Sequence, residues 1–404
     1  MVLATAVVGF FCWIMNHGRT VLAQLLDAIG AKEFERIAVR YPMKRDTPAF
    51  SAYDHFATMV FSQLTFRESL RDLEVCLGAR QSLLYHSGIR GRPTRTNIAY
   101  ANENRDWRFF SDLASFLMKR ARGAYQTVNL PIDLDGDLFA LDSSIIDLSL
   151  KLFPWAKWQG SQSAVKLNLL LDLRGNIPAF ASLEKATSGD VLALDEIPVY
   201  PGCYYVIDRG YIDLKRLHTL TLKDAYFVTR FKRNLRTYVV TSNDCANQPG
   251  IRCDQLVRFS SSRGRKVYPD LVRRIRFKDP ATERSLIFLT NNFALEASVI
   301  ALIYRHRWQV ELFFKWIKQH LQIHSFLSLS ENGIRIQIWS ALCTYLLVAL
   351  LQHACNLPGT LHQVLRTLSI ASLEKVPVQE LFTRFDTTDH GNDIPIQLNL
   401  SGFC

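Results

Sequence analysis

The chain lacks any CxxC pair, although its 404 residues include eight cysteines. The nearest two, Cys245 and Cys253, have no pair of histidines at the spacing that completes a zinc finger. This pattern argues against an ordinary zinc-binding module. We therefore expect free thiols, which fits an intracellular protein.

The chain also lacks an apolar run that is long enough to be an obvious membrane span. Residues 1–14 are almost wholly apolar, but they are too few to span a bilayer and have no basic segment before them. We interpret them as a mis-called N-terminal extension, because an amphipathic helix follows Met15 at once; a signal peptide or anchor is the alternative. The other apolar run, 338–351, contains Ser340 and Thr344, and it predicts a buried helix. We expect no membrane association.

Glutamate is absent from residues 209–278, which contain 17 Lys and Arg against five Asp. That segment therefore carries a net charge of +12, whereas the whole chain carries +11. A basic block of this size suits a polyanion such as DNA. A solvated basic surface is the alternative that composition alone leaves open.

The first third of the chain has the apolar spacing of helices. Residues 17–120 contain such patterns at 21–29, 56–77 and 105–122. The segment 88–95, Gly-Ile-Arg-Gly-Arg-Pro-Thr-Arg, interrupts them as a basic loop. Its Arg-Gly-Arg-Pro sequence suits a DNA minor groove, but it is also an ordinary loop composition.

Strand patterns follow. We predict strands at 137–150 and 203–208, a hairpin of 164–172 with 177–183, and helices at 190–196 and 213–222. This order matches the start of an RNase H-like α/β fold. Five short β-type runs between 225 and 290 predict a β-rich insertion, and this insertion carries most of the positive charge. Helical patterns return at 295–321 and 333–351, and the segment after 357 predicts a peripheral helix and a tail.

Two apolar runs end on an aspartate. Asp142 ends Leu-Phe-Ala-Leu-Asp, and Asp208 ends Tyr-Tyr-Val-Ile-Asp. If these two strands are parallel neighbours, both side chains project at their carboxyl ends, where sites form in open α/β sheets. Taken alone, each aspartate is as often a turn or cap residue.

A third acid lies in the helical pattern at 295–321. At 100° per residue, four polar side chains fall within one strip of about 60°, and these are Tyr304, Arg307, Glu311 and Lys318. A separate apolar stripe runs along another side of the same pattern. The alternative is a solvated helix in which Arg307 and Glu311 form an i,i+4 ion pair.

Three carboxylates from separate elements suggest a pair of metal ions. Mg²⁺ prefers oxygen ligands, and two ions about 4 Å apart are able to support phosphodiester cleavage. Asp142, Asp208 and Glu311 are the candidate ligands.

These residues carry a family resemblance. The pattern Tyr304-x₂-Arg307-x₃-Glu311-x₆-Lys318 resembles the signature of DDE transposases of the insertion-sequence 4 family, and the segment 288–293, Phe-Leu-Thr-Asn-Asn-Phe, resembles the one that precedes it there. Asp142 in Leu-Asp-Ser-Ser is similar to the family's first acid. Asp208 in Ile-Asp-Arg-Gly-Tyr is similar to the second. The long interval before the third acid matches a family with a β-strand insertion, and the resemblance covers about 15 to 355.

The resemblance implies cut-and-paste DNA transposition. Asp142, Asp208 and Glu311 would bind two Mg²⁺ or Mn²⁺ ions and cleave DNA at insertion-sequence ends. Tyr304, Arg307, Lys318 and Arg209 would contact the DNA. Some relatives use a Trp in the insertion to trap a flipped base, and residues 209–307 contain no Trp. A DNA hairpin step is therefore left open.

The resemblance also implies the organisation and partners. We expect a helical DNA-binding domain at 15–125 and a core in two parts at 130–222 and 291–355. The basic β-rich insertion occupies 223–290, and a C-terminal helix and tail occupy 356–404. Partners would be terminal inverted repeats, target DNA and a second copy in a homodimeric synapse, in a bacterial cytoplasm and associated with the nucleoid. A stand-alone RNase H-like nuclease and an inactive DNA-binding remnant are the rival interpretations.

Overall fold

The computed structural model describes residues 18–43, 50–148, 153–156, 163–245, 248–279 and 283–383. They form a mixed α/β protein with one large sheet and an N-terminal helical region. Two compact units divide the chain. The helical unit holds the described residues of 18–127, 145–165 and 314–383, and the sheet unit holds those of 128–144 and 166–313. The predicted extension at 1–14 and the tail from 384 onward lie outside the described residues.

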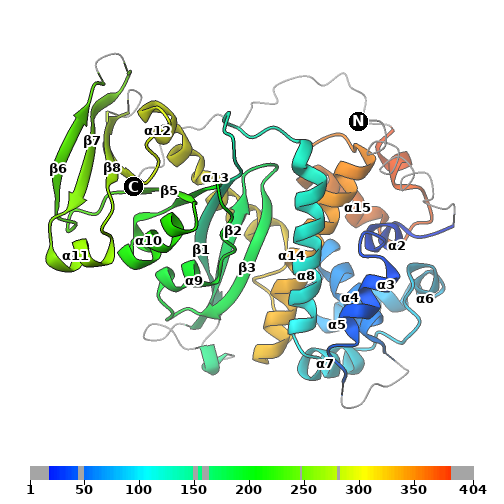
Figure 1. The fold of residues 1–404 in the computed structure, drawn as a ribbon. Helices are drawn as coiled ribbons and strands as arrows, with labels where there is room; N and C mark the ends of the chain where they lie inside the picture. The colour runs from blue at the N-terminus through cyan, green and yellow to red at the C-terminus, as the bar shows by residue number, and fades with distance from the viewer. Residues whose placement is uncertain are drawn as a thin grey trace. The chain divides into compact units, whose positions relative to one another are not determined.

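The helical unit is built around one long helix. Its helices are α2 (Val21–Leu26), α3 (Ala31–Ala38), α4 (Ala52–Leu64), α5 (Leu70–Gly78), α6 (Gln81–Leu84), α7 (Arg95–Asn104), α8 (Arg108–Ala124), α14 (Glu331–Cys355) and α15 (Leu361–Ala371). Every residue of α14 from 336 to 351 is buried, and α8 lies along it (Figure 1). The prediction of a buried helix at 338–351 is therefore confirmed. In the described part of the chain, α14 alone has the length and apolar composition of a membrane span, and 94% of that stretch is buried inside the protein.

The predicted helical pattern at 56–77 is two helices rather than one. Phe66 lies between α4 and α5 with a φ of 58°, which is left-handed and ends the regular helix. Ser51 and Ser69 then cap the two helices, because each side chain accepts an amide hydrogen bond from three residues further on. The helical spacing of apolar residues predicted which positions are buried, but it did not predict the turn between the two helices.

The segment after 357 is more than a peripheral helix. α15 is present as predicted, but its Val364, Leu365 and Leu368 are fully buried. The amides of Val21 and Leu22 donate to the carbonyls of Glu374 and Ser372 at 2.9 and 2.8 Å. This segment therefore belongs to the core of the helical unit.

The sheet unit contains most of a nine-stranded sheet. Its strands are β1 (Leu138–Leu148), β2 (Ser163–Asp172), β3 (Ile177–Lys185), β4 (Tyr204–Ile207), β5 (Tyr226–Arg230), β6 (Thr237–Asn243), β7 (Ile251–Phe259), β8 (Val272–Lys278) and β9 (Ser285–Thr290). The strand order is β3-β2-β1-β4-β5-β9-β8-β7-β6. Its helices are α9 (Ala193–Glu196), α10 (Leu214–Leu222), α11 (Ser262–Val267), α12 (Ala297–His306) and α13 (Trp308–His320), of which 314–320 lie in the helical unit.

The centre of the sheet is parallel, as its apolar runs predict. β1 pairs with β4 and β4 with β5, both in parallel register. Gly136 allows the chain to enter β1 close to the turn before β4. A Cβ built at Gly136 would lie 2.2 Å from the Gly202 carbonyl oxygen, so no larger residue fits there without a shift of the backbone.

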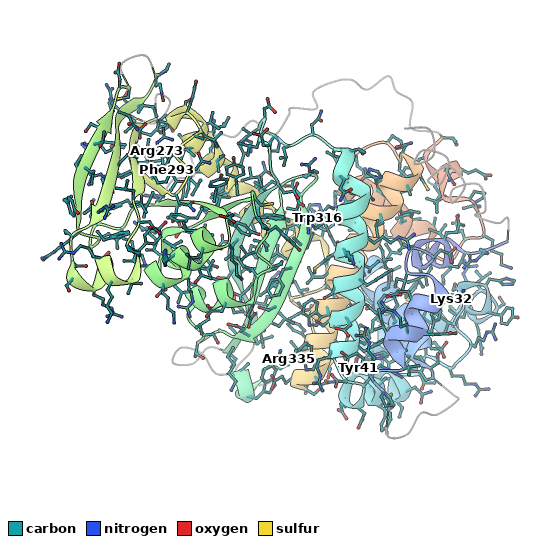
Figure 2. The ribbon with its side chains drawn as sticks, in the orientation of Figure 1. Lys32, Tyr41, Arg273, Phe293, Trp316 and Arg335 are labelled. Carbon is teal, nitrogen blue, oxygen red and sulfur yellow. The ribbon has the colours of Figure 1, made fainter. Side chains whose placement is uncertain are left out.

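The five strands predicted between 225 and 290 are all present as β5 to β9. They continue the sheet rather than forming a separate one, because β9 pairs antiparallel with β5. Arg273 of β8, labelled beside Phe293 in Figure 2, is buried and donates to the Asp254 carboxylate at 2.7 and 2.8 Å. α11 was not predicted. Ser261 caps it by accepting from the Gly264 amide at 3.0 Å.

Candidate active site

The first two acids lie on neighbouring strands. In the parallel register of β1 and β4, Leu141 pairs with Ile207, so Asp142 and Asp208 follow at the same position along the sheet. This confirms that the two strands are adjacent and parallel. Asp142 does not end its strand, however, because β1 continues to Leu148.

Backbone amides hold both aspartates. The Ser143 amide donates to Asp142 Oδ1 at 2.9 Å. Asp208 caps a short 3₁₀ turn, Arg209–Tyr211, and its Oδ2 accepts from the Gly210 amide at 3.2 Å. Asp208 is thus both a cap residue and a candidate ligand, which shows that these two interpretations of its sequence position do not exclude each other.

The third acid lies on a helix that begins where another ends. The pattern at 295–321 predicted one helix, but α12 ends at His306 and α13 begins at Trp308. At the junction, the amide of Arg307 donates to the Tyr304 carbonyl at 3.1 Å, and the Val310 amide donates to the Arg307 carbonyl at 3.2 Å. These i→i+3 bonds tighten the chain there. The prediction of one unbroken helix over 295–321 is therefore wrong.

At this junction, the side chains of Tyr304 and Arg307 contact the three acids. The Tyr304 hydroxyl donates to Asp208 Oδ1 at 3.2 Å. The Arg307 guanidinium donates to Asp142 Oδ2 at 3.3 Å and to Glu311 Oε1 at 2.5 Å. The predicted i,i+4 ion pair of Arg307 with Glu311 is thus present, but it is part of a network of five side chains.

The network has an unequal electrostatic effect on the two aspartates. Burial raises the pKa of Asp142 to about 6; the charge of Arg307 opposes this, and the charges of Glu311 and Asp208 add to it. Burial also acts to raise the pKa of Asp208, but the amide hydrogen bond of Gly210 and the charge of Arg307 outweigh it, so that pKa lies below its ordinary value. Asp142 is the acid whose ionisation costs more here, and a bound cation would relieve that cost.

The two remaining predicted site residues lie elsewhere. Arg209 is exposed and, within the described residues, makes no ion pair with an acid. Lys318 belongs to the helical unit, where its ammonium donates to the Ile145 carbonyl at 2.8 Å. Burial lowers the pKa of Lys318, while the charge of Asp147 opposes the change.

Three residues beside the acids were missed. Ser143 follows Asp142, and its hydroxyl donates to Asp190 Oδ1 at 3.3 Å. The same Asp190 oxygen accepts from the Lys166 ammonium at 2.7 Å. One sequence signal was present, because Lys166 is the single cation within the strand pattern 163–172.

The acids have the right chemistry for a divalent cation. Asp142, Asp208 and Glu311 offer only oxygen donors, which Mg²⁺ and Mn²⁺ favour. Their present arrangement is not a finished metal site. Among the described residues, no three Asp, Glu, His or Cys side chains are arranged to hold one ion. Arg307 donates to both Asp142 and Glu311, so a protein cation already supplies positive charge between these two acids.

Comparison of the sequence with known families gives a clear match. The family described as "Transposase DDE domain" matches residues 133–347, which is 215 of the 404 residues. A domain of unknown function matches residues 17–90. The first match contains all three candidate acids.

Several curated proteins are similar to this chain. The putative transposase y4zB of Sinorhizobium fredii is 33% identical over 230 residues, which cover 56% of this chain and 63% of that protein. A probable transposase for insertion sequence element IS5377 of Geobacillus stearothermophilus is 25% identical over 238 residues, or 58% and 61% of the two chains. A putative transposase for insertion sequence element IS4SA of Synechocystis is 26% identical over 253 residues, or 59% and 68%. The chain thus spans less than two thirds of the first two relatives.

The similarity of this chain to one solved structure is weak. A piggyBac transposase synaptic complex with hairpin DNA covers 90% of this chain and 82% of its own, at 10% identity and a TM-score of 0.47. That score is too low to establish a shared fold.

The fold and the site define an α/β protein in which three carboxylates, from β1, from the end of β4 and from α13, gather around one arginine. The chain belongs to the family of proteins with a transposase DDE domain, on the match to more than half of its length.

Proposed function

We propose that this protein is a DDE transposase, which cleaves and joins DNA at the ends of an insertion sequence. The observation that supports this most directly is the convergence of Asp142, Asp208 and Glu311 from three separate elements, with Arg307 bonded to two of them. The family match and the names of the relatives support the same activity.

We also propose that the chain has an RNase H-like core, which an insertion interrupts. The order β3-β2-β1-β4, with β1 and β4 parallel, supports such a core. The strands that follow before α12 then correspond to the insertion. The proposed division keeps a helical DNA-binding domain at 15–125 and the insertion at 223–290.

Asp142, Asp208 and Glu311 are the proposed ligands of two Mg²⁺ or Mn²⁺ ions. Bound there, such ions supply activation of the attacking water and neutralise charge on the phosphate. The protein contributes the orientation of the acids. Ser143 and Gly210 fix the two aspartates through amide hydrogen bonds. Arg307 is free to pair with a phosphate once it leaves Asp142 and Glu311, because its guanidinium binds phosphate as readily as carboxylate.

The basic segment is the proposed DNA-contacting surface of the sheet unit. Eleven of its cations are exposed and make no ion pair among the described residues, and these are Arg209, Lys215, Lys223, Arg233, Arg236, Arg252, Arg258, Arg263, Arg265, Lys266 and Arg276. Buried Arg273 differs, because Asp254 already neutralises it. Each exposed cation that contacts a phosphate should steepen the salt dependence of binding by about one unit.

The proposed partners are duplex DNA with terminal inverted repeats, target DNA and a second copy of the chain. The proposed location is the bacterial cytoplasm, at the nucleoid. Residues 209–307 contain no Trp, so either another residue traps the flipped base or the step differs from that of the relatives that use such a Trp.

A strand-cleavage assay tests the function. The substrate is DNA with the inverted repeats that flank the gene, incubated with the full chain and Mg²⁺, and Asp208→Asn is the control. Specific cleavage at the 3′ end that the control lacks is the expected result. Binding without cleavage would instead indicate an inactive remnant, and cleavage without sequence preference would indicate a stand-alone nuclease.

A further inference from the structure

Lys166 is a charged residue inside a fully buried strand. Its side chain is only 6% exposed, and every residue of β2 is buried. Its ammonium donates to Asp190 Oδ1 at 2.7 Å and to the Ser188 carbonyl. Burial of a lysine is costly even when it is paired, and an apolar pair of similar size would hold two elements together as well. Stability alone therefore gives little reason for this pair.

The pair is connected to Asp142 through Ser143. Asp190 Oδ1 accepts both the Lys166 ammonium and the Ser143 hydroxyl, the latter at 3.3 Å. The amide of the same Ser143 donates to Asp142 Oδ1 at 2.9 Å. One chain of contacts thus runs from β2, through the 3₁₀ helix Asp190–Leu192 before α9, to the acid on β1.

The other oxygen of Asp190 lies near Gly210, two residues after the second aspartate. A Cβ built at Gly210 would lie 3.9 Å from Asp190 Oδ2 and 3.8 Å from Asp208 Oδ2. The Gly210 amide is also a hydrogen-bond donor to Asp208. Tyr211, which follows, is 2% exposed, and its pKa is raised by burial and by the charges of Asp142, Asp190 and Asp208. Asp190 and Asp208 therefore both lie next to Gly210, and Ser143 links Asp190 to Asp142.

We propose that Lys166 and Asp190 are positioning residues for the site, which hold Ser143, and through it Asp142, in the orientation that a divalent cation requires. Neither residue touches the reacting phosphate. The inference rests on the proposed function for its biological meaning, but it concerns the metal-binding geometry of the acids. It assigns a role to two residues that lie outside the acid triad and outside the Tyr-Arg-Glu-Lys pattern.

A simple charge effect makes the opposite prediction. If Lys166 acted only as a nearby positive charge, Lys166→Met would strengthen the binding of a cation to the acids. If it positions them, Lys166→Met should weaken that binding. Loss of such an outer partner typically costs about 10- to 100-fold in metal affinity or activity.

The first test is Mn²⁺ binding by the full chain without DNA, measured by titration calorimetry. Ser143→Ala is the sharpest variant, because it changes no charge and removes the hydroxyl that joins Asp190 to β1. We expect Ser143→Ala and Lys166→Met each to weaken Mn²⁺ binding by about 10-fold or more, and Lys166→Arg to recover part of the loss. Lys185→Met is the matched control, because Lys185 is an exposed lysine on the adjacent strand β3 and should have no effect.

Kinetics on the DNA substrate give the second test. The positioning role lowers kcat at saturating Mg²⁺ and leaves the KM for DNA unchanged, whereas general unfolding lowers the amount of active protein and the melting temperature. Should Lys166→Met fail to fold, Ser143→Ala decides the question by itself.

The outcomes separate the two proposals. If the wild-type chain cleaves no DNA, the proposed function fails, but the Mn²⁺ titration still tests the positioning role because it needs no turnover. Unchanged or stronger Mn²⁺ binding in Ser143→Ala and Lys166→Met overturns the inference. Weaker binding in both, with recovery in Lys166→Arg, supports it.

Discussion

Arg307 and Glu311 form an ion pair of 2.5 Å, and the same guanidinium donates to Asp142 at 3.3 Å. The side chains of Arg307 and Asp142 are 14% and 19% exposed, so solvent screens this contact only in part. The arginine therefore acts as an internal counter-ion for two of the three candidate ligands. Metal binding and the contacts of Arg307 would be coupled, because both bring positive charge to the same two carboxylates.

This coupling predicts an unusual response to Arg307→Met. Without metal, the variant leaves Asp142 and Glu311 without a counter-charge, so we expect a loss of stability of about 2 kcal/mol, between the values for exposed and buried pairs. Mn²⁺ should restore more stability to the variant than to the wild type. Thermal melts in EDTA and in Mn²⁺ measure both effects, with exposed Arg305→Met as the control. Equal gains from Mn²⁺ in the two proteins would contradict the counter-ion role.

Glu311→Gln tests the third ligand directly. The amide keeps the size of the side chain and its contact with Arg307 but removes the negative charge. We expect DNA binding to persist and cleavage to be abolished, as measured by band shift and strand-cleavage assays on the same substrate. The exposed Glu296→Gln on the preceding helix is the matched control. Undiminished cleavage by Glu311→Gln would remove Glu311 from the ligand set.

Tyr304→Phe separates a positioning role from a DNA contact. The hydroxyl donates to Asp208, and the ring lies 5.0 Å from that of Phe288, between ring centroids. Phenylalanine keeps the ring contact, so the stability cost should be about 1 kcal/mol. The pKa of Asp208 should rise, because the hydrogen bond helps to lower it. We expect lower kcat with unchanged affinity for the DNA end; weaker binding at unchanged kcat would instead favour a phosphate contact.

His55 gives the helical unit a pH dependence. Burial, together with the charge of Arg105, lowers the pKa of His55 to about 3 from 6.5, while its hydrogen bond with Asn102 opposes the change. The unfolded chain therefore binds an additional proton below pH 6.5, and stability falls as the pH drops through this window. The expected loss between that pH and about pH 5 is about 2 kcal/mol. Melting curves should show His55→Gln to be less sensitive to acid than wild type and than the control, exposed His86→Gln.

The sequence predicted those parts of the site that depend on local pattern. Apolar runs ending at Asp142 and Asp208 located two parallel strands, and short β-type runs located five more. The junction at Arg307 was not predicted, because an unbroken apolar period continues across it and only the backbone hydrogen bonds reveal the turn. The Lys166–Asp190 pair was also missed. Its two residues lie 24 positions apart, and only the packed sheet brings them together.

Lys318→Ala distinguishes two roles for the last residue of the signature. Its ammonium is bonded to the Ile145 carbonyl, which suggests that it fixes the end of β1 within the helical unit. In that case, the variant should lose about 1 kcal/mol of stability, because a half-exposed charged donor contributes little more. The salt dependence of DNA binding should then stay unchanged, whereas a phosphate contact would reduce its slope by about one unit. Melting curves and binding at several salt concentrations measure the two quantities, with Lys315→Ala, an exposed lysine of the same helix, as the control. A flatter slope with unchanged stability would restore Lys318 to the DNA contacts.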